Sequence, residues 1–317
     1  MTSPPRTIGI PNALLLAQYI PFWKTFFESL GLKVVLSGKT TQGLLRRAVE
    51  IAPSHYCLSM KVFIAHSESL LDKVDALFIP SLVSLNLKGH NCPNVLGAPK
   101  IIYSVLSPKI PIISPWIDLR EKSLYRIAFE LAQPYTLNPF TILDAVSNAQ
   151  KAMALYQTEM TAPLQEIEKR WAEDDDKNSN QIVVGLVGHP YILKDTAINM
   201  NCRERLEKCG VKVIESTALG SVDKGEWTGP VKLFSYFGTS RFQWDFSDEV
   251  LDSAFTFASK SWCDGVVYLT AFSCGPDALI TQFIAEELKA RTDKPIAIYN
   301  LDEHGGEAGF QTRIESF

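Results

Sequence analysis

The chain opens with short apolar runs separated by a longer segment in which apolar and polar residues recur at helical spacing. Residues 6–10 and 33–36 are strand-like runs, and the amphipathic segment between them ends at Gly31. Alternation of these two patterns predicts a β-α-β unit, with Gly31 at the C-cap of the helix.

The same alternation continues through the first third of the chain. Helical spacing over 41–51 and 57–71 is followed by a buried strand near 75–80. The runs "KIIYSV" at 100–105 and "PIIS" at 111–114 predict two further short strands of this sheet.

The middle of the chain has a different pattern. From Asp118 to about Arg170 it is rich in Ala, Leu, Gln and Glu, which predicts helix. The stretch "AEDDDKNSNQ" at 172–181 is charged and poor in apolar residues, so it cannot offset its ordering entropy by burial. We interpret it as a solvated linker.

After the linker the opening pattern returns. The junction "CGVKVIEST" at 209–217 repeats "LGLKVVLSG" at 30–38, and the apolar run at 264–272 corresponds to the run near 75–83. A repeat in this order predicts two similar parallel α/β domains in tandem. The expected elements are a strand from 182 onward, a helix over 195–210, strands at 211–217, 264–272 and 295–301, and a C-terminal helix; the expected domains are 1–117 and 182–317, joined by a helical segment and linker at 118–181.

Length and charge narrow the class of protein. A chain of 317 residues suits two α/β domains, and a net charge of −4 argues against nucleic-acid binding, which needs clustered basic residues. The apolar window "NALLLAQYIPFW" contains Gln18 and Pro21 and is too short to span a membrane. No signal peptide is recognisable at the start, so we expect a cytoplasmic protein that does not bind membranes.

Six cysteines are spread along the chain, and none forms a C-x-x-C pair. Cys274 directly follows a predicted strand, Cys92 lies in the loop after the corresponding strand of the first domain, and Cys57 begins a helix. Ligands of open parallel sheets lie at the carboxyl ends of the strands, and a helix start favours a thiolate, so these three are the candidate functional thiols. The other three are interpreted as structural, with Cys209 in the core: Cys202, Cys209 and Cys263.

Three kinds of chemistry fit these thiols. A nucleophilic cysteine needs a histidine base, for which His189 or His304 is available, but it leaves two thiols without a role. A zinc site of the Cys₃His type needs one of three histidines, and its ligands are usually closely spaced pairs. An iron–sulfur cluster with three cysteine ligands and one open iron accounts for all three thiols. The histidines that could complete the zinc site are His55, His66 and His90.

Several motifs, taken in order, resemble a known family. They are "IGIPNALL", "PFWKTFFESLGLKVVLS", "CLSMKVFIAH", "LLDKVDALFIPSLVS", "CPNVLGAP", "GLVGHPYIL", "FSCGPDA" and the terminal "LDEHGGEAGFQTRIESF". In this order the chain resembles the acyl-CoA dehydratase activase-related proteins of the DUF2229 type, within the 2-hydroxyacyl-CoA dehydratase/benzoyl-CoA reductase-like superfamily. The resemblance runs nearly end to end.

The resemblance implies two tandem Rossmann-like domains that hold an oxygen-sensitive iron–sulfur cluster in the cleft between them. Its cluster cysteines fall on Cys57, Cys92 and Cys274. Its partner would be an ATP-hydrolysing activator protein that itself carries a cluster. The chain departs from the family pattern where Asn12 and Ser81 replace arginines and Ser59 interrupts "CLPVK", which weakens the case for an anionic or CoA-thioester substrate but leaves the cluster ligands intact.

Other residues are expected near the cluster. Gly275 and Pro276 keep the turn after Cys274 tight and are expected to line the cofactor site. Glu303 and His304 follow the last predicted strand, so with His189 they are candidate proton donors or acceptors. A helix-capping role for the acidic residues after that strand is the alternative.

The sequence therefore predicts a protein that binds a [4Fe–4S] cluster through three cysteines. It would act in low-potential electron transfer driven by the activator, or reduce a small substrate at the open iron, as a component of an ATP-dependent reductase or dehydratase-like system. A double-cubane [8Fe–9S] cluster, or two sites meeting in a homodimer, is a variant. The alternatives are a non-catalytic cluster-carrying subunit and a metal-free small-molecule binding protein.

Overall fold

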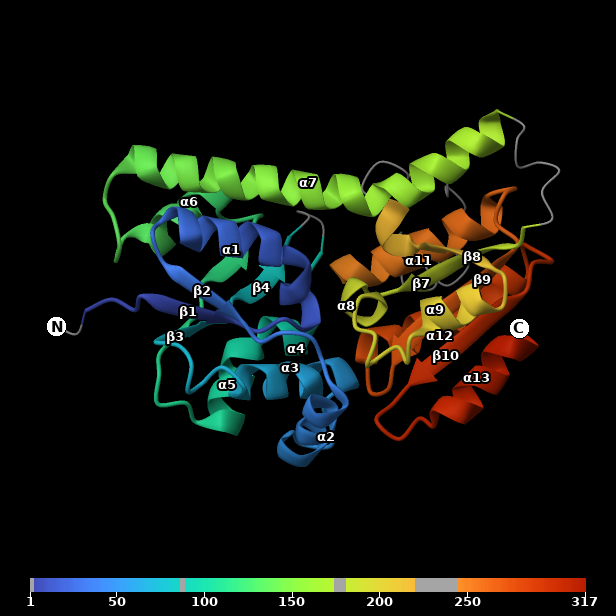
Figure 1. Ribbon diagram of the computed structural model, residues 1–317, viewed down its shortest axis with the longest axis horizontal. Helices are drawn as coiled ribbons and strands as arrows, with labels where there is room; N and C mark the ends of the chain where they lie inside the picture. Colours follow the sequence, from blue (N-terminus) through green and yellow to red (C-terminus); the bar gives the residue numbers. More distant parts are fainter. Residues whose placement is uncertain (1–2, 86–88, 174–180, 220–243) are drawn as a thin grey trace. The chain divides into compact units, whose positions relative to one another are not determined.

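The computed structural model describes residues 3–85, 89–173, 181–219 and 244–317. It is an α/β protein whose strands pair in parallel (Figure 1). The chain divides into two compact units, Met1–Tyr156 and Gln157–Phe317, called here the N-terminal and C-terminal units. Within the described ranges no helix is long and apolar enough to cross a membrane.

The N-terminal unit is built on a four-stranded sheet with the order β2-β1-β3-β5 and a two-stranded sheet of β4 and β6. Its strands are β1 (Thr7–Ile10), β2 (Lys33–Leu36), β3 (Ala76–Phe78), β4 (Ser81–Ser84), β5 (Ile112–Ile113) and β6 (Trp116–Asp118). Its helices are η1 (Leu14–Tyr19), α1 (Ile20–Ser29), α2 (Gln42–Ile51), α3 (Leu58–Glu68), α4 (Pro93–Leu96), α5 (Ala98–Leu106), α6 (Leu124–Ala132) and the start of α7 (Pro139–Ala172).

The C-terminal unit contains a second four-stranded sheet, in the order β10-β9-β7-β8. Its strands are β7 (Val183–Gly188), β8 (Lys212–Glu215), β9 (Gly265–Ala271) and β10 (Ile296–Leu301). Its helices, besides the end of α7, are α8 (Pro190–Leu193), α9 (Cys202–Lys208), η2 (Ser216–Leu219), α11 (Asp245–Ser259), α12 (Gly275–Lys289) and α13 (Glu307–Ser316).

The two four-stranded sheets have the same strand order. In each, the first strand lies between the second and the third, and the fourth lies outside the third. The helices before β2 and β8 also end alike, because Gly31 (φ +77°) and Gly210 (φ +84°) adopt the left-handed conformation that favours glycine. The helix end predicted at Gly31 is therefore confirmed, with Leu30 as the C-cap residue and Gly31 as the left-handed residue after it. The repeat in the sequence is matched by the same strand order in the two sheets.

Each sheet is covered by helices that bury apolar side chains on it, which explains why the strands read as continuous apolar runs. In the N-terminal unit, Trp23 and Phe27 of α1 pack on Phe78 of β3, with ring centroids 4.8 and 5.0 Å apart. In the C-terminal unit, Phe257 of α11 packs so closely on Gly185 of β7 that a Cβ there would overlap the ring. Close packing of the helix on the sheet therefore leaves no room for a side chain at Gly185.

Two predicted elements are wrong. The run at 100–105 is part of the helix α5, which has Pro99 in its first turn and buries Ile102 completely while leaving Tyr103 67% exposed. An apolar run this short does not distinguish strand from helix by its period. The helix expected over 195–210 is confined to Cys202–Lys208, because Met200 and Asn201 have φ values of +52° and +54°, which interrupt a right-handed helix.

The middle of the chain is mostly a single helix. The helical pattern expected from 118 appears as α6 and as α7, which runs to Ala172, and the division between the two units falls inside α7. Residues 174–180 of the expected linker lie outside the described residues.

Candidate functional site

Cys57, Cys92 and Cys274 occupy the same local position, immediately before a helix. They precede α3, α4 and α12, and each has the extended backbone of an N-cap residue. The carbonyl of each accepts a hydrogen bond from the backbone N–H four residues later, while its thiol does not cap the helix. Because the first N–H groups of a helix form a positive end, all three sulfurs lie where a thiolate is favoured.

In the N-terminal unit, the structure brings the surroundings of Cys57 and Cys92 together. Asn94, in the first turn of α4, donates a hydrogen bond from Nδ2 to Sγ of Cys57 at 3.7 Å. Cys57 is 7% exposed, and Cys92 is half-buried. Two thiols separated by 35 positions therefore belong to one region of this unit, as expected for ligands at one edge of a sheet.

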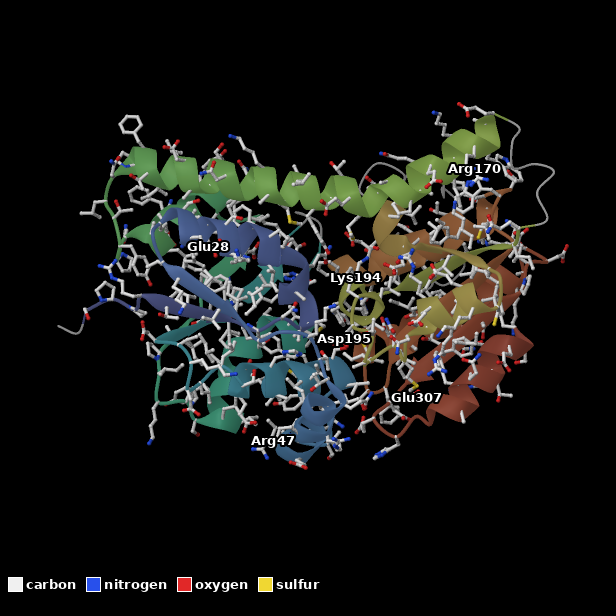
Figure 2. All side chains as sticks on the ribbon, in the orientation of Figure 1. Glu28, Arg47, Arg170, Lys194, Asp195 and Glu307 are labelled. Atoms are coloured by element: carbon white, nitrogen blue, oxygen red, sulfur yellow. The ribbon has the colours of Figure 1, made fainter. Side chains whose placement is uncertain are left out.

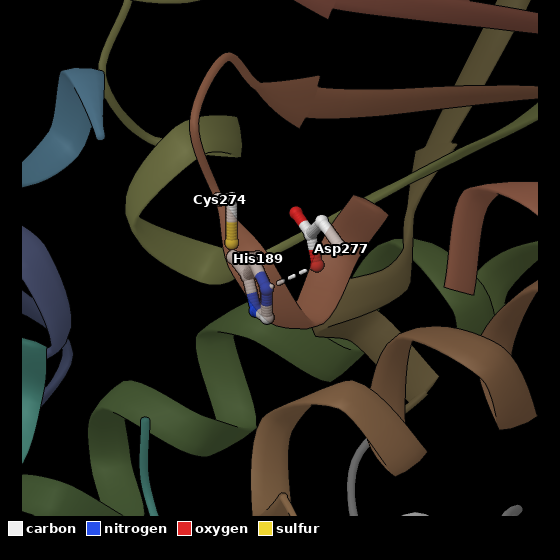
Figure 3. Close-up of side chains that lie close together, drawn as sticks. All are labelled: His189, Cys274 and Asp277. Atoms are coloured by element: carbon white, nitrogen blue, oxygen red, sulfur yellow. Dashed lines mark hydrogen bonds and ion pairs between the residues drawn. The ribbon is translucent and has the colours of Figure 1, made fainter. Parts of the chain in front are cut away.

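In the C-terminal unit, Cys274 lies beside His189 and Asp277 (Figure 3). One ligand atom from each side chain lies within 4.8 Å of the other two. The sheet explains the convergence, since Gly188, the last residue of β7, is paired with Leu269 of β9, so the chain leaves both strands at the same edge. A Cβ on Gly188 would meet the carbonyl oxygen of Leu269 at 2.9 Å, so glycine permits this close approach.

Asp277 and His189 form a buried hydrogen-bonded pair. His189 Nε2 lies 2.7 Å from Asp277 Oδ1, and Thr270 Oγ1 donates to Asp277 Oδ2 at 3.0 Å. Burial opposes ionisation of Asp277, but His189 and the hydrogen bond from Thr270 hold the pKa of this carboxyl below its usual value. Burial and the negative charges of Asp277 and Cys274 raise the pKa of Tyr268 well above its usual value. This corner of the unit therefore holds a carboxylate without access to solvent.

The turn after Cys274 differs in detail from the expectation. A Cβ at position 275 would meet no neighbouring atom, and the backbone there is not in the left-handed conformation, so neither feature requires glycine. Pro276 occupies the first turn of α12. Ser273 instead adopts the left-handed conformation, with φ +62°, and Cys274 N–H donates to the carbonyl of Ala271. The tightness of the turn thus comes from Ser273, and the assignment of Gly275 and Pro276 to a cofactor site stays a prediction.

Glu303 and His304 follow β10, the neighbour of β9, and so lie at the same edge of the C-terminal sheet. Glu303 is half-buried, while His304 is exposed and its N–H donates to Asp302 Oδ1 at 2.8 Å. Neither belongs to the group formed by His189, Cys274 and Asp277. His189, the third candidate proton-transfer residue, is a member of this group.

The remaining cysteines have different surroundings. Burial raises the pKa of the Cys202 thiol to about 12 and that of Cys263 to about 11, and the Cys263 thiol donates to the carbonyl of Gly265 at 3.2 Å. Both are inert core residues, in agreement with the sequence. The prediction that Cys209 is in the core is wrong: it is exposed, because it lies at the C-cap of α9, where the helix turns outward at Gly210.

The histidines considered for a zinc site have other contacts. His66 is fully buried between two hydroxyls, with Nδ1 2.7 Å from Ser37 Oγ and Nε2 2.9 Å from Thr40 Oγ1. Burial lowers its pKa to about 4, so the ring is neutral and bridges the loop after β2 to α3. His55 lies against Tyr56 in a tilted arrangement, with ring centroids 4.3 Å apart, and His90 contacts Arg120. Each of the three rings therefore has a contact within the N-terminal unit.

Sequence reasoning missed Asn94, Thr270 and Asp277. Asp277 stands three residues after Cys274, a spacing typical of an acidic residue that stabilises a helix start, so nothing marked it as a partner of a histidine 88 positions away. The one available signal was the acidic residue in the first turn after a thiol.

Comparison with known proteins places the chain in a family. Among curated proteins no match is found. Two solved structures of the SBP FpvC from P. aeruginosa align along nearly the whole chain at low similarity, and TM-scores this small establish no common fold. The complex with Ni²⁺ has 12% identity, covers 98% of this chain and 93% of its own, and has a TM-score of 0.27; the complex with Mn²⁺ has 12% identity, covers 98% and 94%, and has a TM-score of 0.26.

Residues 7–219 match the family model described as the CoA enzyme activase uncharacterised domain (DUF2229). This confirms the resemblance to proteins of the DUF2229 type that the ordered motifs indicated. Because the match covers more than half of its residues, the chain belongs to the DUF2229 family of CoA enzyme activase uncharacterised domains.

Proposed function

We propose that this protein is an iron–sulfur protein in which Cys57, Cys92 and Cys274 are the ligands of a [4Fe–4S] cluster, with one iron left to a non-cysteine ligand or a small substrate. The observation that carries the proposal is their shared position. Each of the three thiols lies at the first residue before a helix, whereas Cys202 and Cys263 are sealed in the core.

The donor set fits such a cluster. Thiolates are soft ligands that select iron–sulfur clusters, and a thiolate at a helix start is stabilised by the positive end of the helix. In the N-terminal unit, Asn94 donates to Cys57 Sγ, and hydrogen bonds to ligand sulfurs are one of the means by which proteins tune a cluster. Lys61, which is 4% exposed, lies one turn after Cys57 in α3.

A cluster bound here would supply the capacity to accept and deliver one electron at a time. The residues of the chain would do the rest: the thiolates hold it, Asn94 donates to one ligand sulfur, and His189 presents Nδ1 as a proton donor or acceptor beside Cys274. Glu303 and His304 are retained as candidate proton carriers at the same edge of the C-terminal sheet.

Membership of the family supports a role beside a CoA enzyme. Within the 2-hydroxyacyl-CoA dehydratase/benzoyl-CoA reductase-like superfamily, electrons would come from an ATP-hydrolysing activator protein and pass to a small substrate or to a second cluster. The proposal includes the finer description of the fold as two tandem Rossmann-like domains, and it requires both units to contribute thiols to one cluster. A double-cubane [8Fe–9S] cluster, a homodimer or a non-catalytic cluster-carrying subunit would use the same ligands.

A thiol nucleophile is the second candidate, and one observation favours it. Cys274 lies at the start of a 15-residue helix beside His189, which is in turn oriented by Asp277. A thiol, an imidazole and an orienting carboxylate are the parts of a cysteine-dependent acyl-transfer site. This candidate needs Cys274 alone, so it predicts that Cys57 and Cys92 are dispensable.

Iron and acid-labile sulfide content, measured with the visible spectrum after anaerobic purification, tests both candidates. The cluster proposal expects iron and sulfide in the wild type, and loss of both in Cys57→Ala, Cys92→Ala and Cys274→Ala. Cys209→Ala, which removes an exposed thiol outside the site, is the matched control and should retain the cluster. A colourless, iron-free wild type, or three variants that keep their iron, would refute the proposal. Rapid alkylation confined to Cys274 in an iron-free protein would favour the nucleophile instead.

A further inference from the structure

His189 has one ring nitrogen whose role the fold does not explain. The side chain is 3% exposed, and within the described part of the chain Nδ1 is buried without a hydrogen-bond partner. Buried polar atoms are almost always hydrogen-bonded or bound to a ligand, because leaving one unsatisfied costs free energy. A buried nitrogen in this state is available to a ligand.

The rest of the imidazole ring is held in place. Nε2 lies 2.7 Å from Asp277 Oδ1, and the ring stacks on Tyr191 with a centroid distance of 5.1 Å and an interplanar angle of 9°. Since a carboxylate only accepts hydrogen bonds, Nε2 carries the proton, and in the neutral ring Nδ1 has a free lone pair. A histidine whose second nitrogen donates to a carboxylate is the usual arrangement of a metal ligand.

A second donor atom lies beside the imidazole ring. One ligand atom from each of His189, Cys274 and Asp277 lies within 4.8 Å of the other two, and the Cys274 sulfur lies next to the ring (Figure 3). A sulfur and a nitrogen bound to one tetrahedral metal ion, with bonds of about 2.3 and 2.0–2.1 Å, lie about 3.6 Å apart. The spacing of the group is therefore compatible with one ion bound by the sulfur and the imidazole after the side chains adjust.

We propose that His189 Nδ1 and Cys274 Sγ bind a single divalent cation of the Zn²⁺, Co²⁺ or Fe²⁺ class within the C-terminal unit. Asp277 is the positioning residue rather than a ligand, because its two oxygens already accept hydrogen bonds from His189 and Thr270. Mixed nitrogen and sulfur donors select these cations over Mg²⁺ and Ca²⁺, which bind oxygen. Cys274 is half-buried, so water completes the coordination.

This site does not depend on the three-cysteine cluster, since it requires neither Cys57 nor Cys92. The two proposals share Cys274, whose sulfur binds either the lone ion or an iron of the cluster. Occupation by a divalent cation and assembly of the cluster are thus alternative states of one thiol, and Zn²⁺ added before iron and sulfide should block reconstitution.

Titration of the full-length, iron-free protein with Co²⁺ under anaerobic, reducing conditions tests the site. The probe is Co²⁺ itself, whose bond to a thiolate gives an intense near-ultraviolet absorption band. We expect this band in the wild type and in the Cys57→Ala/Cys92→Ala double variant, and its loss in Cys274→Ala. We expect Asp277→Asn to weaken Co²⁺ binding by about 10- to 100-fold, as for other residues that orient a ligand.

His189 is tested with two variants and one control. His189→Ala and His189→Gln should both abolish tight binding, and circular dichroism at each titration identifies a variant that has not folded. His304→Ala, at the same edge of the sheet but exposed, should bind as the wild type does. Equal Co²⁺ affinity in wild type, a folded His189 variant and Cys274→Ala overturns the inference. Loss of the band in the Cys57→Ala/Cys92→Ala variant also overturns it, whereas a wild type that binds Co²⁺ but never assembles a cluster refutes only the cluster proposal.

Discussion

Replacing His189 by alanine would leave Asp277 as a carboxylate with no exposed surface and without its histidine partner. Removing the partner of a buried charge typically costs about 3–5 kcal/mol, because the charge remains buried and uncompensated. A second substitution, Asp277→Asn, removes that stranded charge while it keeps the shape of the side chain. We therefore expect the His189→Ala/Asp277→Asn double variant to be more stable at pH 7 than His189→Ala alone.

The pH dependence follows from the sign of each shift in pKa. In the wild type the pKa of Asp277 is lowered, so its contribution is present above about pH 3.9 and is lost only as the pH falls through the still lower folded value. Without His189, burial outweighs the remaining hydrogen bond from Thr270 and raises the pKa of Asp277. The folded state of the single variant then binds a proton that the unfolded state releases, and its stability falls as pH rises, by up to about 1.4 kcal/mol per pH unit.

The comparison uses the single and the double variant, because neither contains His189 and they differ only at Asp277. Urea unfolding at pH 5, 6 and 7, fitted with a separate transition for each unit, gives the free energy of unfolding of the C-terminal unit. The double variant should have the larger free energy of unfolding at pH 7. The difference between the two variants should decrease towards pH 5 by up to about 3 kcal/mol. Equal stability of the two variants at every pH would show that Asp277 does not depend on His189 for charge compensation.

Two further predictions concern Ser273, whose backbone is left-handed, and His66, whose pKa is lowered by burial. Ser273 has φ +62°, so Ser273→Gly should stabilise the C-terminal unit by up to about 1 kcal/mol in urea unfolding; Ser107→Gly, at φ +44° in the N-terminal unit, is the parallel case, and destabilisation by both would contradict the reasoning. Because burial lowers the pKa of His66 to about 4 while an unfolded histidine titrates near 6.5, its contribution to stability is complete above about pH 6.5 and is lost as pH falls towards 4, by up to about 3 kcal/mol. His66→Gln should remove this dependence and His304→Gln, at an exposed position, should not; an unchanged pH profile in His66→Gln would refute it.

Local sequence patterns predicted most elements and the position of the candidate thiols. Strand-like runs and Gly31 were readable because burial on both faces of a parallel sheet and a left-handed C-cap each impose a local residue preference. The prediction failed at 100–105, where a short apolar run has no distinguishable period, and at Cys209, where a turn at Gly210 directs the residue to solvent.

The sequence by itself determined the alternation of strands and helices, the repeated β-α-β opening, and the placement of Cys57 at a helix start and of Cys274 between a strand and a helix, because each of these depends on residues close together in the chain. The helix that begins after Cys92, which the sequence placed in a loop, came only from the structure. Only the tertiary structure decided which side chains meet. Asp277 pairs with His189 because β7 and β9 are neighbours in the C-terminal sheet, and the order of strands is set by packing of the whole unit. A contact across 88 positions leaves no local pattern, so the hydrogen bond between His189 and Asp277 beside Cys274 could be found only in three dimensions.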